Sequence, residues 1–193
     1  MSEEQQKSAR GLKAIRLKKL VPSYELSWRT RNDEGFAKSS EWRNEIRPRI
    51  LLRDNYTCRY CGFRSEKGMN VGHVDGNPKN NLSSNLEVVC GMCHMITHTG
   101  LWCAVFDVVD LYAESKYSQN DVIKITREMR EKGKRDDEIV SFLGLKSPMP
   151  WRQDLRYLSR LYGFVSSRQP RSRTKPLLTE EEQQRRLSAR DRW

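Results

Sequence analysis

TCRYCG at residues 57–62 and VCGMCH at residues 89–94 carry the two C-x-x-C pairs that decide the fold of this chain. Two residues between cysteines allow a tight turn to direct both sulfurs at one ion, and a glycine beside or inside each pair suits such a turn. We therefore expect one tetrahedral zinc site with four thiolate ligands, Cys58, Cys61, Cys90 and Cys93. The alternative is two unrelated redox or core pairs. The 28 residues between the pairs exceed the roughly 15–20 of a common zinc ribbon, so further structure must lie between them.

The three histidines of the chain, His73, His94 and His98, all lie inside or just after this cysteine frame. On a helix, the four-residue spacing of His94 and His98 places both imidazoles on one face, where they can share a metal. Because four thiolates already complete a zinc site, the histidines predict a second function. The alternatives are a spare set of zinc ligands and ordinary surface histidines.

The segment as a whole resembles the HNH endonuclease family, whose ββα-metal domains include members with a zinc-stapled frame. The resemblance covers residues 43–100 and rests on motifs that follow one another in the family's order. These motifs are RDNYTC at 53–58, the first cysteine pair, VGH at 71–73, NL at 85–86 and CHMITH at 93–98.

The resemblance implies metal-dependent hydrolysis of phosphodiester bonds in DNA. It implies that His73 is the general base that activates water, and that Asn85 orients this base. It further implies that His94 and His98 bind a catalytic divalent metal such as Mg²⁺, Mn²⁺ or Ni²⁺, which stabilises the leaving oxygen.

Gly72 departs from the family pattern. Most members place an acidic residue or a histidine there, and that side chain ligates the catalytic metal. Asp75, two residues after His73, would lie on the same face of a strand and is the candidate to supply the missing oxygen. Gly72 also favours an alternative, a catalytically inactive module of the same fold that binds nucleic acid or a protein.

The same segment has a narrower resemblance to the DotN (IcmJ) group of type IVB secretion proteins. The shared motifs are RDNYTCRYCGF at 53–63, VDG at 74–76 with the following pair Asn80-Asn81, and SNL at 84–86. That group looks like HNH domains reused as zinc-stapled scaffolds that bind a partner. It does not keep the catalytic histidines as a set, whereas this chain has all of them.

The charge of the chain points to an anionic partner. The sequence has 193 residues with 36 Lys and Arg against 25 Asp and Glu, a formal net charge of +11. Most of the excess lies in residues 1–57 and 168–193, and the cysteine frame is almost neutral. Basic ends around a neutral centre predict arms that hold the phosphates of nucleic acid, with ordinary solubility charge as the alternative.

We expect an α+β fold with four regions. They are a basic N-terminal arm at 1–40, an HNH-like zinc domain at 41–100, a mainly α-helical extension at 101–165 and a flexible basic tail at 166–193 with a terminal helix. Capping and apolar spacing predict helices that start at Ser118, at Asp136 or Asp137, and near Trp151. The extension and the terminal helix are candidate surfaces for a protein partner.

The sequence also predicts a cytoplasmic protein without membrane insertion. Its apolar runs are far shorter than the roughly 18 residues of a membrane span. The first 30 residues are charged throughout and lack the apolar stretch of a secretory signal. In a reducing compartment the cysteines would stay free of disulfides.

Overall fold

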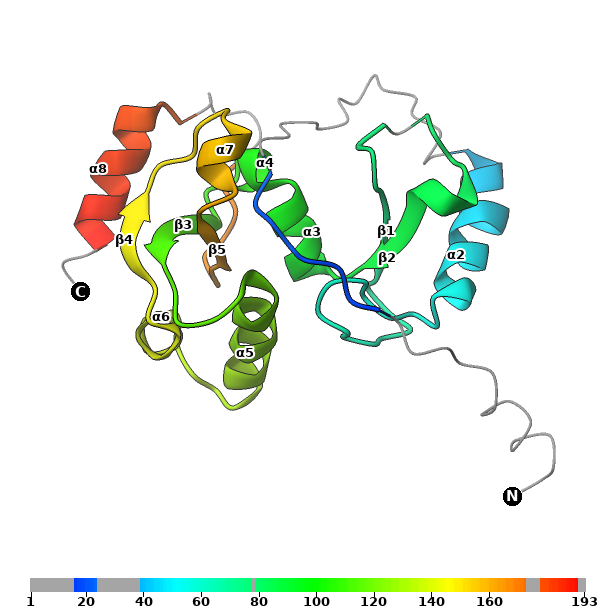
Figure 1. The fold of residues 1–193 in the computed structure, drawn as a ribbon, viewed down its shortest axis with the longest axis horizontal. Coiled ribbons are helices and arrows are strands. Elements are labelled where there is room, and N and C mark those ends of the chain that lie inside the picture. Colours follow the sequence, from blue (N-terminus) through cyan, green and yellow to red (C-terminus); the bar gives the residue numbers. More distant parts are fainter. Residues whose placement is uncertain (1–15, 24–38, 78, 173–177, 191–193) are drawn as a thin grey trace.

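The computed structural model describes residues 16–23, 39–77, 79–172 and 178–190. The cysteine frame folds around a two-stranded antiparallel sheet that lies between helices α2 and α3 (Figure 1). Its elements are a π-helical turn at Trp42–Ile46, α2 at Arg47–Arg53, β1 at Asn70–His73, a 3₁₀ turn at Ser83–Asn85, β2 at Leu86–Val89, α3 at Gly91–Thr97 and α4 at Thr99–Ala104. Helix α2 continues directly from the π-helical turn, and its second residue is Pro48, which has no backbone N–H to donate.

Strands β1 and β2 set the positions of the residues that matter below. Their register pairs Gly72 with Glu87 and His73 with Leu86. Every residue of β2 is buried because α2 and α3 cover the sheet, whereas β1 is half-buried. Helix α3 follows β2 directly, so the second cysteine pair and two histidines come just after a buried strand.

Residues 109–165 build a three-stranded antiparallel sheet in the order β4-β3-β5, with helices α5 and α6 beside it (Figure 1). The bounds are β3 Val109–Glu114, α5 Gln119–Glu131, α6 Asp136–Leu143, β4 Lys146–Met149, α7 Leu155–Leu158 and β5 Tyr162–Val165. The expectation of a mainly α-helical extension is therefore corrected. The helical pattern near Trp151 yields only the single turn α7, because Tyr162–Val165 pairs with β3 instead, and such pairing overrides local spacing.

The other two helices of this region were predicted correctly in position. The hydroxyl of Ser118 caps α5 by accepting from the N–H of Asp121. Helix α6 ends at Gly144, which takes a left-handed φ of 63° that glycine tolerates. Arg135 occupies the N-cap position of α6, and Phe142 near its end is 51% exposed.

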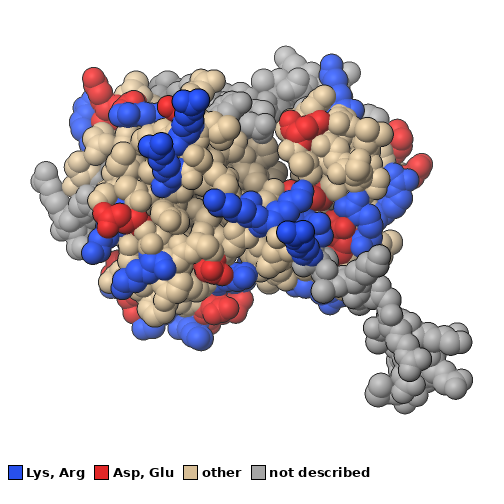
Figure 2. Space-filling model, in the orientation of Figure 1, with Lys and Arg blue, Asp and Glu red and all other residues tan. Residues whose placement is uncertain are grey.

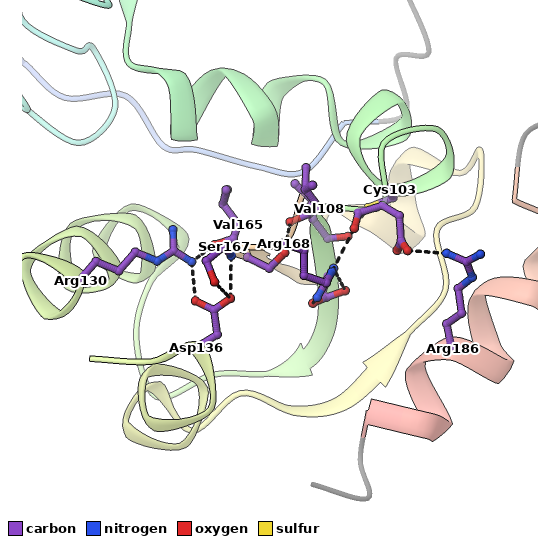
Figure 3. Close-up of polar contacts among 12 residues, drawn as sticks. Cys103, Val108, Arg130, Asp136, Val165, Ser167, Arg168 and Arg186 are labelled. Atoms are coloured by element: carbon purple, nitrogen blue, oxygen red, sulfur yellow. Dashed lines mark hydrogen bonds and ion pairs between the residues drawn. The ribbon is translucent and has the colours of Figure 1, made fainter. Parts of the chain in front are cut away.

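The chain after β5 is held against the body along residues 166–172, which corrects the expectation of a flexible tail there. The N–H of Ser166 bonds the carbonyl of Val108, and the Arg168 guanidinium makes a bidentate ion pair with the buried Asp110 at 2.6 and 2.8 Å. Figure 3 shows Ser167 and Arg130 converging on Asp136 beside it. Arg168 and Ser167 therefore bind carboxylates of the body, and these charged hydrogen bonds hold residues 166–172 in place.

Helix α8, Glu180–Arg190, is the expected terminal helix, and it packs against the body. Gln183 is buried, and its amide oxygen accepts from the N–H of Trp151 at 2.9 Å. Arg186 pairs with Asp107 at 2.6 Å (Figure 3). Residues 173–177 and 191–193 of the expected tail lie outside the described residues.

Residues 16–23 form an extended segment that crosses α3 and reaches the first cysteine pair (Figure 1). The Lys18 N–H bonds the carbonyl of Arg59 at 2.8 Å. The Asn120 side chain accepts from the Leu20 N–H at 2.9 Å and donates to the carbonyls of Lys18 and Tyr60, each at 2.7 Å. The segment therefore joins the cysteine frame to α5. The remainder of the expected N-terminal arm, residues 1–15 and 24–38, lies outside the described residues.

One apolar core runs through both parts of the protein. It joins Ile50, Val88 and Ile96 of the cysteine frame to Leu111 and Ile123 of the extension, all at most 1% exposed. Within the residues that the structure describes, no helix combines the length and apolar character needed to cross a membrane.

Candidate metal centre and the histidine cavity beside it

The sulfurs of the two C-x-x-C pairs meet in one buried cluster. All four Sγ atoms lie within 4.8 Å of one another, and they belong to Cys58, Cys61, Cys90 and Cys93. The first turn closes through a bond from the Gly62 N–H to the Cys58 carbonyl, with a φ of 74° at Gly62 that a side chain would oppose. The second pair starts α3, where the Cys90 sulfur accepts from the Cys93 N–H.

The cluster fits a zinc ion. Zinc–thiolate bonds of about 2.3 Å in a tetrahedron place the sulfurs about 3.8 Å apart, and the Cys61 and Cys90 sulfurs are 3.6 Å apart. Four thiolates complete the tetrahedron and leave no open position, which is the donor set of a structural zinc site.

Arg127 of α5 lies against this cluster and was not foreseen from the sequence. Its guanidinium donates to the sulfurs of Cys90 at 3.2 Å and Cys61 at 3.6 Å, and it stacks over the Phe63 ring at 3.7 Å. Burial alone would lower the pKa of Arg127, but the hydrogen bond to Cys61 and the charge of Cys90 raise it. A fixed positive charge next to thiolates offsets the excess negative charge of a four-thiolate zinc site. No local motif marks Arg127, because it lies in a different helix from the cysteines.

Beside the cysteine cluster lies a cavity of about 180 Å³ that His73, His94 and His98 all line. His73 ends β1, His94 lies on α3, and His98 is the residue that caps α3 at its C-terminus. The His94 and His98 rings are 4.6 Å apart and meet edge to face. The three histidines lie within a stretch of 26 residues of the sequence, and the fold places all of them in the wall of one cavity.

His73 is held from two sides. Its Nε2 lies 3.0 Å from the amide oxygen of Asn81, and its ring stacks on Trp42 with centroids 5.5 Å apart. An amide oxygen can only accept, so this contact is a hydrogen bond in the tautomer that has its proton on Nε2. The sequence did not predict that Asn81 and Trp42 would contact His73, although Asn81 belongs to an Asn-Asn pair in the loop after His73.

Asn85 fixes the loop that follows His73. Its amide nitrogen donates to the Asp75 carboxylate at 2.8 Å and the Asn80 carbonyl at 2.9 Å, and its amide oxygen accepts from the Asp75 N–H at 3.1 Å. The Asn80 amide and the Asn77 N–H also donate to Asp75, at 2.7 and 2.8 Å. Hydrogen bonds from Asn85, then from Asn80, lower the pKa of Asp75. Asp75 is thus committed to the loop, and it is not one of the residues that line the histidine cavity.

A different carboxylate lines the cavity, that of Glu87. It lies directly across the sheet from Gly72, and both residues line the cavity. Glu87 is 6% exposed, and its oxygens bond the Lys18 ammonium at 2.5 Å and the Tyr60 hydroxyl at 2.6 Å. Burial and the bond to Glu87 raise the pKa of Tyr60, so this hydroxyl stays a donor. The available sequence signal is a single acidic residue inside the apolar run LEVVC at 86–90.

The two sites differ in how close their ligands lie. Among the described residues, the cysteine cluster is the only group of three or more His, Cys, Asp or Glu ligand atoms within 4.8 Å of one another. Of the predicted catalytic residues, His73, His94 and His98 line one cavity and Asp75 does not, and together they do not form a preassembled ligand set.

Comparison with known proteins gives one partial similarity. No protein-family model matches the chain. A segment of 45 residues is 40% identical to the type 4 apparatus protein DotN of Legionella pneumophila subsp. pneumophila strain Philadelphia 1. The similarity covers 23% of this chain and 21% of DotN, so the chain matches about a fifth of that protein's length.

Proposed function

We propose that this chain is a zinc-stabilised module of the HNH type that hydrolyses phosphodiester bonds in DNA with the help of a divalent metal. The observation that carries the proposal is that His73, His94 and His98 line one cavity. The order β1, β2, α3 around a four-cysteine cluster agrees with a ββα-metal core.

The proposed mechanism assigns each group a role. His73 takes a proton from the attacking water through Nδ1, while Asn81 and Trp42 hold its ring in place. Asn85 keeps the loop after His73 closed, which preserves this orientation. His94 and His98 would hold the metal, which when bound stabilises the negative charge on the phosphate and on the leaving oxygen.

The distribution of charge supports a nucleic-acid partner. Figure 2 shows basic side chains running across the middle of one face, where segment 16–23 passes between the two parts of the protein. This segment contributes Arg16, Lys18 and Lys19. In this proposal residues 41–100 carry the chemistry, and the basic regions at either end add affinity for phosphates without selecting a sequence. Free cysteines and a thiolate zinc site suit the cytoplasm, where we place the protein.

The direct test is nicking of supercoiled plasmid by the zinc-loaded chain in the presence of Mg²⁺, Mn²⁺ or Ni²⁺. We expect metal-dependent cleavage that falls by roughly 10²–10⁴-fold in His73→Ala, the range for loss of a general base. The zinc content of His73→Ala should match the wild type, since His73 is not part of the cysteine cluster, and a cooperative thermal unfolding transition would establish that the variant is folded. Absence of cleavage with all three metals, or equal cleavage by His73→Ala, would refute the proposal.

A second candidate function is a non-enzymatic scaffold that binds a protein partner. The similarity to DotN and the missing side chain at Gly72 favour it. A scaffold needs the fold but not the chemistry, so His73→Ala would keep its function in the source cell while Cys58→Ser would lose it. A nuclease would lose its function with either substitution.

A further inference from the structure

We propose that Glu87 is the carboxylate ligand of a divalent metal site completed by His94 and His98, and that the Lys18 ammonium competes with the metal for this carboxylate. The inference deepens the proposed function and rests on it for the role of that metal. It assigns to Glu87 the role that Gly72 cannot fill.

The sheet places Glu87 directly opposite Gly72. Gly72 and Glu87 are paired residues of β1 and β2, so side chains at these positions lie on the same face of the sheet. Both residues line the cavity that His94 and His98 line. A ligand lost from one strand is thus matched by a carboxylate on the strand opposite.

The backbone at Gly72 would accept a side chain. Its φ is not positive, and a Cβ built there would meet nothing closer than Val89 Cγ1 at 3.5 Å, an ordinary contact. Neither backbone strain nor crowding therefore requires glycine at this position. The missing side chain instead leaves room in the cavity wall directly opposite Glu87.

Glu87, His94 and His98 offer a donor set that suits a divalent metal. Two imidazoles and one carboxylate form a common catalytic set for Zn²⁺, Fe²⁺ and related ions, and three protein ligands leave positions open for substrate. Asp75 does not line this cavity, and its carboxylate accepts from Asn77, Asn80 and Asn85 in the loop outside it.

Lys18 balances the charge of the Glu87 carboxylate in the structure. A carboxylate that is 6% exposed needs a counter-charge, and the Lys18 ammonium supplies it at 2.5 Å. The Lys18 side chain is 40% exposed, so its ammonium can move into water without burying a charge. A dication bound to Glu87 would take the place of this ammonium, so the proposed metal binding and the Lys18–Glu87 ion pair exclude each other.

The test is titration of the zinc-loaded full chain with Mn²⁺, followed by calorimetry and by electron paramagnetic resonance of free Mn²⁺. Mn²⁺ prefers oxygen and nitrogen donors and leaves a four-thiolate zinc site undisturbed. We expect one Mn²⁺ per chain beyond the zinc, an affinity at least tenfold weaker in Glu87→Gln, and an affinity about tenfold tighter in Lys18→Met. The matched control is Glu66→Gln, whose carboxylate is 70% exposed and should leave Mn²⁺ affinity unchanged.

Zinc content and thermal unfolding establish that each variant is folded. If Glu87→Gln fails to fold, Lys18→Met decides the matter, because it keeps both the carboxylate and the histidines. Mn²⁺ affinity that is unchanged in Glu87→Gln, or that is not tighter in Lys18→Met, overturns the inference.

The readout is binding, so the outcome separates this inference from the proposed function. Mn²⁺ that binds through Glu87 while plasmid stays intact would refute the nuclease and keep the site. Cleavage that needs His73 but is unaffected by Glu87→Gln would refute the site and keep the nuclease.

Discussion

The cysteine cluster and the histidine cavity share helix α3, which carries Cys93 of the first and His94 of the second, yet they are built in opposite ways. The cysteine sulfurs are buried within 4.8 Å of one another, and Arg127 offsets their charge. The histidines line a cavity of about 180 Å³ whose carboxylate is already paired with Lys18. A closed, complete donor set suits a metal that stabilises the fold, and an open, incomplete one suits a metal that meets substrate. The comparison predicts that substitutions at the first site change stability and those at the second change chemistry.

Cys58→Ser should have the largest effect and tests whether the first site is structural. We expect loss of the zinc and of the folded cysteine frame, a destabilisation of about 5 kcal/mol or more, because structural zinc supplies folding free energy directly. Metal analysis and thermal unfolding measure the result. The matched control is Cys103→Ala, which removes a buried cysteine outside the cluster and should keep one zinc per chain. Zinc retained by Cys58→Ser would contradict the four-thiolate assignment.

Arg127→Ala sharpens the comparison by removing the charge that accompanies the first site only. We expect a loss of about 1.5–3 kcal/mol, the usual value of hydrogen bonds to charged groups, together with faster transfer of zinc to a chelator. Chemical denaturation and a chromogenic zinc indicator measure the two effects. Lys124→Ala on the same helix removes a partly exposed charge that pairs with Asp121, and it should change neither. Zinc release at the wild-type rate in Arg127→Ala would show that the guanidinium does not support the metal.

Asn85→Ala acts on the second site through its loop. Three hydrogen bonds to Asp75 and Asn80 are lost, so we expect about 1–3 kcal/mol of destabilisation and weaker plasmid cleavage, with zinc content unchanged. The control Asn77→Ala removes only a bond to the Lys79 N–H from an exposed side chain and should behave like the wild type. Full cleavage activity in Asn85→Ala would argue against a positioning role for this loop.

Asp136→Asn should have the smallest effect, because it lies in the extension far along the chain from both sites. Burial alone would raise the pKa of Asp136, but the Ser167 N–H and Arg130 hold it below its usual range. A lowered folded pKa stabilises the protein above the unfolded pKa of about 3.9, and this stability is lost as the pH falls through the folded value.

We therefore expect Asp136→Asn to lose about 1 kcal/mol at pH 7 and to show a flatter decline of stability below pH 4, measured by denaturation across pH. Asp137→Asn, with a side chain that is 58% exposed, serves as the control. An unchanged acid profile in Asp136→Asn would show that the network drawn in Figure 3 does not set acid stability.

The sequence predicted those features that depend on local spacing. Each C-x-x-C turn is determined by its own few residues, and the two pairs meet in one cluster, as predicted. Ser118 caps α5 for the same reason. The paired histidines of α3 lie together because a helix brings residues four apart onto one face.

Features that depend on long-range pairing were not predictable in the same way. Tyr162–Val165 becomes a strand only because β3 lies next to it, and Arg127 meets the cysteines only because the shared core packs α5 against them. Glu87 faces Gly72 through the register of β1 and β2, which no single segment encodes.

Parallel measurement of zinc content and plasmid cleavage in wild type and His73→Ala tests the central claim most directly. The account predicts one zinc per chain in both proteins, and metal-dependent cleavage in the wild type alone. Equal cleavage in the two proteins, or none in the wild type with Mg²⁺, Mn²⁺ or Ni²⁺, would contradict it.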